Sequence, residues 1–420
     1  MNEMVQTPKS FFRTRRYVLF WVSSLFSNIG TWMQQIAQPW VVLSLSNSPF
    51  WVGLDSFALN APGWLFTLLG GVLADHYERR ITVLFFQMMQ FLCVLTLVIL
   101  LAVGWLKVWM IVIISFLVGL TDSLSMPSFQ SIIPSLVEQK DIHRAVSLNS
   151  TQFNLSRLLG PAIAGLVIVR FGAVMCFGAN AVSYIPFFLS LYFIYPRGGL
   201  KIQQGPNDTK PVKQLKEFRN LILNLEVRIP LMIAFIANMF GAPIVTFCAV
   251  IIKNVFLAQA GDFGGAMTAF GIGGLMGAAS SFIPLPKSFK RNMFASAVAI
   301  VLGLIIVAIA FNHSLYLLFV LLVLIGAALT MTNISINTFL QEKAANNIRG
   351  RIVSLYQFAL SGGISIGALL TGFIVSQFNI SAALAINGVL AIIFQAWLLR
   401  KQIKLRPQPR MTTVQNLQNK

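Results

Sequence analysis

Apolar runs of similar length recur along the chain, and short polar segments separate them. The runs cover residues 17–45, 50–74, 81–104, 107–130, 145–169, 172–195, 229–253, 263–284, 291–311, 314–340, 352–376 and 379–400. A helix of about 20 apolar residues spans the hydrocarbon core of a bilayer. The pattern therefore predicts an all-α integral membrane protein with twelve transmembrane helices.

The composition agrees with this class. Of the 420 residues, 56% are hydrophobic and 10% are charged, which is more apolar than a soluble core requires. The first run, 17–45, is too long for the apolar region of a signal peptide, and no small-residue cleavage site follows it. We expect it to be retained as the first span.

The basic residues are unevenly placed. Nearly all of the 31 lysines and arginines lie before the first run, in every second loop, or after the last run, whereas the other loops hold Lys107, Arg170 and Lys253. Cytoplasmic loops carry this excess, so both termini are predicted to be cytoplasmic. The net charge of +19 is thus a topology signal, and we expect no nucleic-acid partner.

The two halves of the chain resemble each other. Arg144-Ala-Val-Ser-Leu148 recurs as Arg351-Ile-Val-Ser-Leu355, and the same ungapped shift places Gly119 on Gly326. Parallel repeats of this kind place the substrate path at the interface between the halves. We therefore predict two parallel-repeat six-helix bundles.

These patterns divide the chain into five parts. They are a cytoplasmic N-terminus (1–16), a first bundle (17–195), a cytoplasmic linker (196–228), a second bundle (229–400) and a cytoplasmic tail (401–420). Near the end of the linker, apolar residues recur at helical spacing with lysine and arginine between them. This predicts a basic amphipathic helix at the membrane surface, either as a tether or as a regulatory site.

Between the second and third runs stands Gly71-Val-Leu-Ala-Asp75-His-Tyr-Glu-Arg79-Arg80. It resembles the loop 2–3 signature of the major facilitator superfamily, Gly-x-Leu-Ala-Asp-x-x-Gly-Arg-Arg/Lys, with Glu78 in place of the second glycine. The resemblance implies the twelve-helix transporter fold. We expect Gly71, Asp75, Arg79 and Arg80 to form a conformational latch that pairs in one state and opens in another.

Two further stretches narrow the resemblance. Arg157-Leu-Leu-Gly160-Pro161-Ala-Ile-Ala-Gly165 is similar to the Gly-Pro signature of antiporter branches. Together with Pro127-Ser-Phe-Gln-Ser-Ile-Ile-Pro134 and Asn154, it resembles the macrolide-efflux and enterobactin-exporter branch. The resemblance implies export of an amphiphilic small molecule, a drug or a siderophore, against proton entry.

Three ionisable residues lie inside apolar runs, where they are costly and usually functional. Asp122 and Arg157 lie on consecutive antiparallel spans at similar depths, so they can form a buried ion pair. That pair either fixes the packing or takes part in proton exchange, and a cavity-facing Arg157 could instead bind an anionic substrate. Asp55, near the outer end of its span, either caps the helix or forms a gate or proton entry point.

A polar stripe follows the first span. Asn28, Thr31, Gln35 and Gln38 fall on one helix face. Such a stripe faces either a cavity or a neighbouring helix. The superfamily resemblance makes the first, fourth, seventh and tenth helices cavity liners, so Asn238 of the seventh span and Asn333 and Asn337 of the tenth join the substrate-cavity candidates. Asn154 of the fifth span is a further candidate.

The sequence lacks the motifs that several classes of activity require. Cys93, Cys176 and Cys248 stand singly within apolar runs, so neither a disulfide framework nor a metal site is predicted. The glycine-rich segments lack the P-loop Lys-Ser/Thr, and no catalytic cluster is evident. We expect a monomeric, cofactor-free, non-enzymatic secondary transporter in the cytoplasmic (inner) membrane, which binds a small-molecule substrate and protons. A proton-coupled importer, a facilitated-diffusion carrier and a non-transporting sensor remain open.

Overall fold

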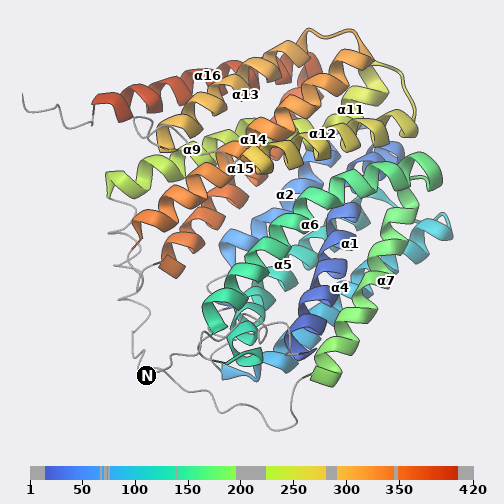
Figure 1. Cartoon of the computed structure of the whole chain (residues 1–420). Coiled ribbons are helices and arrows are strands. Elements are labelled where there is room, and N and C mark those ends of the chain that lie inside the picture. Colours follow the sequence, from blue (N-terminus) through green and yellow to red (C-terminus); the bar gives the residue numbers. More distant parts are fainter. Residues whose placement is uncertain are drawn as a thin grey trace, which may run out of the picture.

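The computed structural model describes residues 15–66, 69–70, 73, 76–138, 141–194, 224–280, 291–344 and 349–404, and these form an all-helical protein (Figure 1). The first half contains α1 (Arg15–Ser46), α2 (Pro49–Leu65), α4 (Arg79–Ala102), α5 (Val108–Ile132) with the short η2 (Ile133–Leu136), α6 (Ile142–Phe171) and α7 (Ala173–Ile194). The second half contains α9 (Leu225–Gly241) with the short α10 (Pro243–Thr246), α11 (Cys248–Val250) and η4 (Ile251–Val255), then α12 (Ala260–Ser280), α13 (Arg291–Ala310), α14 (Leu315–Lys343), α15 (Arg349–Gln377) and α16 (Ile380–Lys404).

Among the described residues, nine helices are long and apolar enough to cross a membrane. The other three predicted spans also form helices, but they fall short of that standard. α2 has only 17 residues, polar side chains lower the hydropathy of α1, and glycines lower that of α12. Twelve crossings and cytoplasmic termini therefore stay a prediction.

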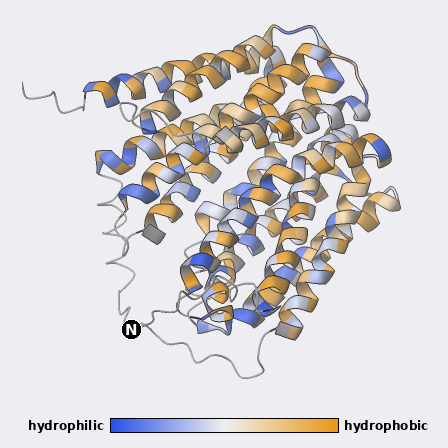
Figure 2. Cartoon of the chain, in the orientation of Figure 1, coloured by the Kyte–Doolittle hydropathy of each residue, from blue (hydrophilic) through white to orange (hydrophobic). Residues whose placement is uncertain are grey.

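Figure 2 shows apolar residues over most of the helices and hydrophilic residues gathered at helix ends.

The connections differ between the two ends of the molecule. One end, here called the basic end, carries the long basic loops. At the opposite end the loops are short, and all four residues with a left-handed φ in the described ranges lie there: Asn47, Gly104, Gly172 and Leu257. Glycine adopts this conformation without a Cβ clash, and asparagine tolerates it better than most residues. The conformation allows consecutive helices to reverse direction over few residues.

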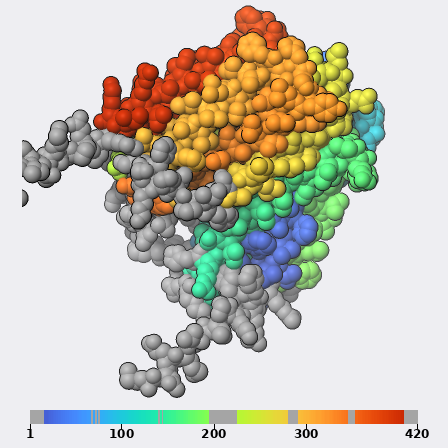
Figure 3. Space-filling view, turned by 45° about the horizontal axis from the view of Figure 1, so that its top comes forward, coloured from blue at the N-terminus to red at the C-terminus, as the bar shows by residue number. Residues whose placement is uncertain are grey.

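Two helix pairs join the halves, because α2 packs along α15 and α6 packs along α12. Figure 3 shows the yellow α12 lying against the green α6. Glycines allow these close approaches, since a Cβ on Gly165 would meet Thr268 and the backbone of Gly264. Small residues let helix backbones approach closely within a membrane.

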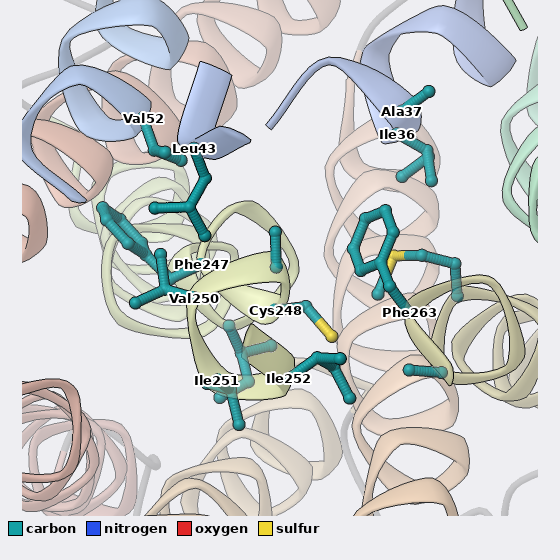
Figure 4. Close-up of a cluster of buried hydrophobic side chains, with 14 of the residues drawn as sticks. Ile36, Ala37, Leu43, Val52, Phe247, Cys248, Val250, Ile251, Ile252 and Phe263 are labelled. Carbon is teal, nitrogen blue, oxygen red and sulfur yellow. The ribbon is translucent and has the colours of Figure 1, made fainter. Parts of the chain in front are cut away.

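The hydrophobic core shows which end is closed. At the opposite end a single cluster includes residues of both halves, and Figure 4 shows Leu43 and Val52 beside Phe247 and Val250. At the basic end the clusters are separate: one contains Tyr17, Val83, Ile132 and Phe187 of the first half, and another contains Val227, Ile336, Leu340 and Leu398 of the second half. The halves are thus packed together at the opposite end and separate at the basic end.

Candidate functional site

Asp122 lies on α5, well inside the predicted span. Asp122 is solvent-exposed although many protein atoms lie around it, and we infer that it faces an opening inside the bundle. The neighbouring polar side chain is Gln90 of α4. The buried amide nitrogen of Gln90 has no hydrogen-bond partner among the described residues, so it is available as a donor to the nearby carboxylate. The Tyr184 hydroxyl donates to Gln90 Oε1 at 3.4 Å.

Arg157 lies on α6 and is half-buried within the bundle. The predicted ion pair with Asp122 is wrong for this conformation, because no salt bridge joins the two in the described part of the chain. The Arg157 guanidinium lies instead over the Trp32 ring, 5.7 Å from its centroid. Trp32 packs directly on Gly160, where any Cβ would collide with it. Sequence depth alone could not show toward which neighbour the long arginine side chain turns.

Asp55 lies on α2 near the opposite end and is 4% exposed. Its carboxylate accepts from Gln38 Nε2 at 2.9 and 2.7 Å and from the Ser115 hydroxyl at 2.6 Å. Gln38 Nε2 also lies 2.8 Å from Ser115 Oγ. Asp55 is therefore not at a water-exposed helix end, and buried donors supply the hydrogen bonds that a buried polar group needs.

A one-way chain of hydrogen bonds leads to Asp55. Thr31 Oγ1 donates to Asn180 Oδ1 at 3.4 Å, Asn180 Nδ2 to Gln34 Oε1 at 2.7 Å, and Gln34 Nε2 to Gln38 Oε1 at 3.3 Å. Each amide of the chain points its NH₂ group toward the Asp55 end, where the carboxylate oxygens accept.

The same chain approaches Asp122. Tyr184 lies beside Thr31 and Asn180, and its hydroxyl donates to Gln90. Polar side chains from α1, α4 and α7 thus extend from the buried Asp55 to the neighbourhood of the exposed Asp122. The first half therefore contains a row of polar side chains between an acid near the closed end and an acid that faces the opening.

The polar stripe on α1 divides between two environments. Asn28, Thr31 and Gln38 bond to neighbouring helices, with Asn28 Nδ2 3.4 Å from Gln152 Oε1. Gln35 is half-buried and forms no side-chain hydrogen bond within the described ranges. Gln34, which the stripe did not include, joins the chain instead.

Gln34, Gln90, Ser115, Asn180 and Tyr184 were not among the residues predicted from the sequence. The available signal was a lone amide, Gln90 or Asn180, within an otherwise apolar run. Such a group needs a partner in the bilayer. Ser115 and Tyr184 gave no comparable signal, because both are common in apolar helices.

Asn238 and Asn333 bind each other inside the second half. Asn238 Nδ2 donates to Asn333 Oδ1 at 2.9 Å, and Asn333 Nδ2 donates back to Asn238 Oδ1 at 3.3 Å. Asn238 is fully buried and Asn333 is 5% exposed. Of the other candidates, Asn337 accepts from Gln341 at 2.9 Å, and the exposed Asn154 donates to the Ser150 carbonyl at 2.8 Å.

We predict that Asn238→Leu lowers the stability of the protein by roughly 1–3 kcal/mol, because it leaves the Asn333 amide buried without its partner. The double variant Asn238→Leu/Asn333→Leu should recover most of that loss. Thermal unfolding in detergent measures both effects. A single variant as stable as the unchanged protein would show that the pair is not a packing device and would return Asn238 to the candidates for substrate contact.

The latch candidates lie partly outside the described residues, since neither Gly71 nor Asp75 belongs to them. Arg79 begins α4, and its guanidinium donates to the Ser131 carbonyl at 3.3 Å. Arg80 donates to the Tyr192 carbonyl at 3.1 Å and lies over the Tyr192 ring, 6.0 Å from its centroid. Both arginines thus bind helix ends of the first half, and the latch stays a prediction.

No group of three or more His, Cys, Asp or Glu side chains that could hold a metal ion occurs within the described ranges. Cys176 and Cys248 are buried and Cys93 is half-buried, all three with free thiols. The functional groups near the opening are instead a carboxylate, a guanidinium, amides and aromatic rings.

Curated relatives match along most of the chain. The Staphyloferrin A transporter of Staphylococcus aureus is 26% identical over 399 residues, covering 92% of this chain and 97% of the relative. The Multidrug efflux pump Tap of Mycobacterium bovis is 24% identical, covering 92% and 94%. The enterobactin exporter EntS of Salmonella choleraesuis is 23% identical, covering 87% and 86%.

Solved transporters share the fold. The nucleoside transporter NupG has a TM-score of 0.71 at 13% identity, covering 93% of this chain and 99% of its own. An inward-facing bacterial homologue of the lysosomal transporter Spinster has a TM-score of 0.66 at 14% identity, covering 96% and 100%. The family model for transmembrane secretion effectors matches residues 6–418. The chain therefore belongs to the transmembrane secretion effector family of the major facilitator superfamily and is a multi-pass membrane transporter.

Proposed function

We propose that this transporter exports an amphiphilic small molecule, such as a siderophore or a drug, from the cytoplasm in exchange for protons. The observation that carries the proposal is the exposed Asp122 inside the bundle, in a protein whose halves separate only at the basic end. Basic loops mark the cytoplasmic side. The opening then faces the cytoplasm, from which an exporter takes its substrate.

The relatives support this direction and this class of cargo. Three that match most of the chain are named for a siderophore, for multidrug efflux and for enterobactin export. The same resemblance favours the cytoplasmic membrane of a bacterium as the location. A monomer suffices, because the first and second halves together enclose the opening.

The row of polar side chains supports proton coupling. A proton-linked exporter needs an acid that reaches each side in turn, and Asp55 and Asp122 lie near the two ends of this row. We assign Asp122 to proton exchange at the basic side and Asp55 to the opposite side. Asp75, Arg79 and Arg80 remain the proposed latch at the cytoplasmic end.

The test uses purified protein in liposomes that contain a pH dye. A pH gradient is imposed, and macrolides, lipophilic cations and catecholate siderophores are then added. Unchanged protein should show substrate-evoked proton movement opposite to the substrate, and Asp122→Asn should lower it by at least tenfold. Asp55→Asn should also impair it.

The matched control is Asp141→Asn, which changes an acid that pairs with Arg144 at the basic end, 3.8 Å away. It should leave proton movement unchanged. Substrate flux without proton movement would contradict antiport and favour facilitated diffusion. Protons that move in the same direction as the substrate would favour an importer, and no flux of any tested substrate would favour a non-transporting sensor.

A further inference from the structure

Arg157 carries a positive charge that no acid in the described part of the chain neutralises. None of its nitrogen atoms forms a hydrogen bond or ion pair within the described part of the chain, and Asp122 turns toward Gln90 instead. A carboxylic acid can neutralise itself by taking up a proton, whereas a guanidinium keeps its charge. An isolated charge in the membrane interior is costly. Arg157 therefore calls for an anion from outside the protein.

The surroundings of Arg157 are aromatic and fixed. The Trp32 ring lies beneath the guanidinium and contacts Phe153 edge-on, with 6.3 Å between ring centroids. Gly160 allows Trp32 to lie directly against α6. The guanidinium thus lies over a ring that itself packs on α6, and its hydrogen-bond donors remain free for a ligand.

Arg157 also lies at the boundary between the halves. Tyr356 of α15 is within electrostatic range of it. The Tyr356 hydroxyl donates to the Asn333 carbonyl at 3.1 Å, so this buried ring is a fixed wall of the second half. A ligand on Arg157 would touch the first half directly and lie close to the second. Rocking of the halves would therefore change its surroundings.

We propose that Arg157 and Trp32 bind the acidic group and the ring of an aromatic acid, as the recognition site for the exported substrate. The inference rests on the proposed function and names its substrate class. A guanidinium offers a planar pair of donors that matches a carboxylate, and the neighbouring rings give an aromatic ligand an apolar surface to stack on.

The test compares two probes that differ by one charge, 2,3-dihydroxybenzoate and its neutral amide, 2,3-dihydroxybenzamide. Binding to the purified full-length protein is measured by calorimetry. The unchanged protein should bind the acid at least tenfold more tightly than the amide. Arg157→Gln should abolish that preference, Arg157→Lys should retain part of it, and Trp32→Leu should weaken binding of both probes.

Arg144→Gln is the matched control, because Arg144 lies on the same helix but is 67% exposed at the basic end. It should keep the full preference for the acid. Thermal unfolding in detergent confirms that each variant is folded. The inference is overturned if the unchanged protein does not bind the acid more tightly than the amide. It is also overturned if Arg157→Gln retains the preference for the acid.

Cationic rhodamine 6G in the liposome assay separates this inference from the proposed function. If rhodamine 6G evokes proton movement but the protein does not prefer the acid, proton-coupled export is supported and the anion site is refuted. A preference for the acid without substrate-evoked proton movement does the reverse.

Discussion

Replacing Gly165 by leucine is expected to open the transporter at the end opposite to the basic loops. A side chain on Gly165 would meet Thr268 and the backbone of Gly264 on α12. This contact joins the two halves, so the protein can relieve it by separating α6 from α12. Overpacking costs roughly 1–3 kcal/mol, which is about a 5- to 150-fold shift between two conformations because 1.4 kcal/mol is about tenfold.

A buried reporter detects the shift. Phe263 is fully buried at the closed end and stacks on Trp40, with 5.2 Å between ring centroids. In a background without Cys93, Cys176 and Cys248, Phe263→Cys should react with a maleimide at least tenfold faster when Gly165→Leu is also present. Flux should fall strongly, because the state that is open at the basic end becomes rare.

Two other glycines provide the controls. Gly178→Leu adds a side chain where no atom lies within 4 Å, so it should change neither reactivity nor stability. Gly367→Leu would collide with the backbone of Met239 on α9, inside one half. It should lower thermal stability without exposing Phe263→Cys. Equal reactivity in the Gly165→Leu and Gly178→Leu proteins would show that this helix contact does not hold the end closed.

The sequence was informative where a property depends on local composition. The helices follow the apolar runs, because backbone groups in a bilayer must bond within the helix. The depth of Asp122 could also be counted along its span. Gly160 and Gly165 were recognised as a motif, and the structure supplies their physical reason, since Trp32 packs on one and α12 on the other.

The sequence was insufficient where function depends on which neighbouring group a side chain contacts. Gln34 and Gln35 are adjacent, yet only Gln34 bonds to Asn180, because helix packing turns one toward α7. Arg157 has enough reach for several partners, and it turns toward Trp32 rather than Asp122. Periodicity gives the face of a helix, but the rotation of that face against its neighbours comes from the packing of the whole bundle.

Cross-linking the closed end should stop transport while leaving substrate binding intact. Lys253 Nζ donates to Asn47 Oδ1 at 2.8 Å, joining the two halves at this end. In the cysteine-free background, Asn47→Cys/Lys253→Cys treated with a short bis-methanethiosulfonate should lose at least nine-tenths of its flux, roughly 1.4 kcal/mol on the rate scale. Dithiothreitol should restore it, since it cleaves the disulfides of the cross-link.

The controls separate tethering from local damage. Asn47 has a φ of 51°, which asparagine tolerates better than cysteine, so the single Asn47→Cys variant measures that strain. A cross-link between Asp141→Cys and Arg144→Cys stays within the basic end of the first half and should leave flux unchanged. In the proposed mechanism ligand reaches the site from the basic end, so the tethered protein should still bind 2,3-dihydroxybenzoate. Undiminished flux through the tethered protein would mean that substrate leaves without separation of the halves, and rocking about a central site would then be the wrong mechanism.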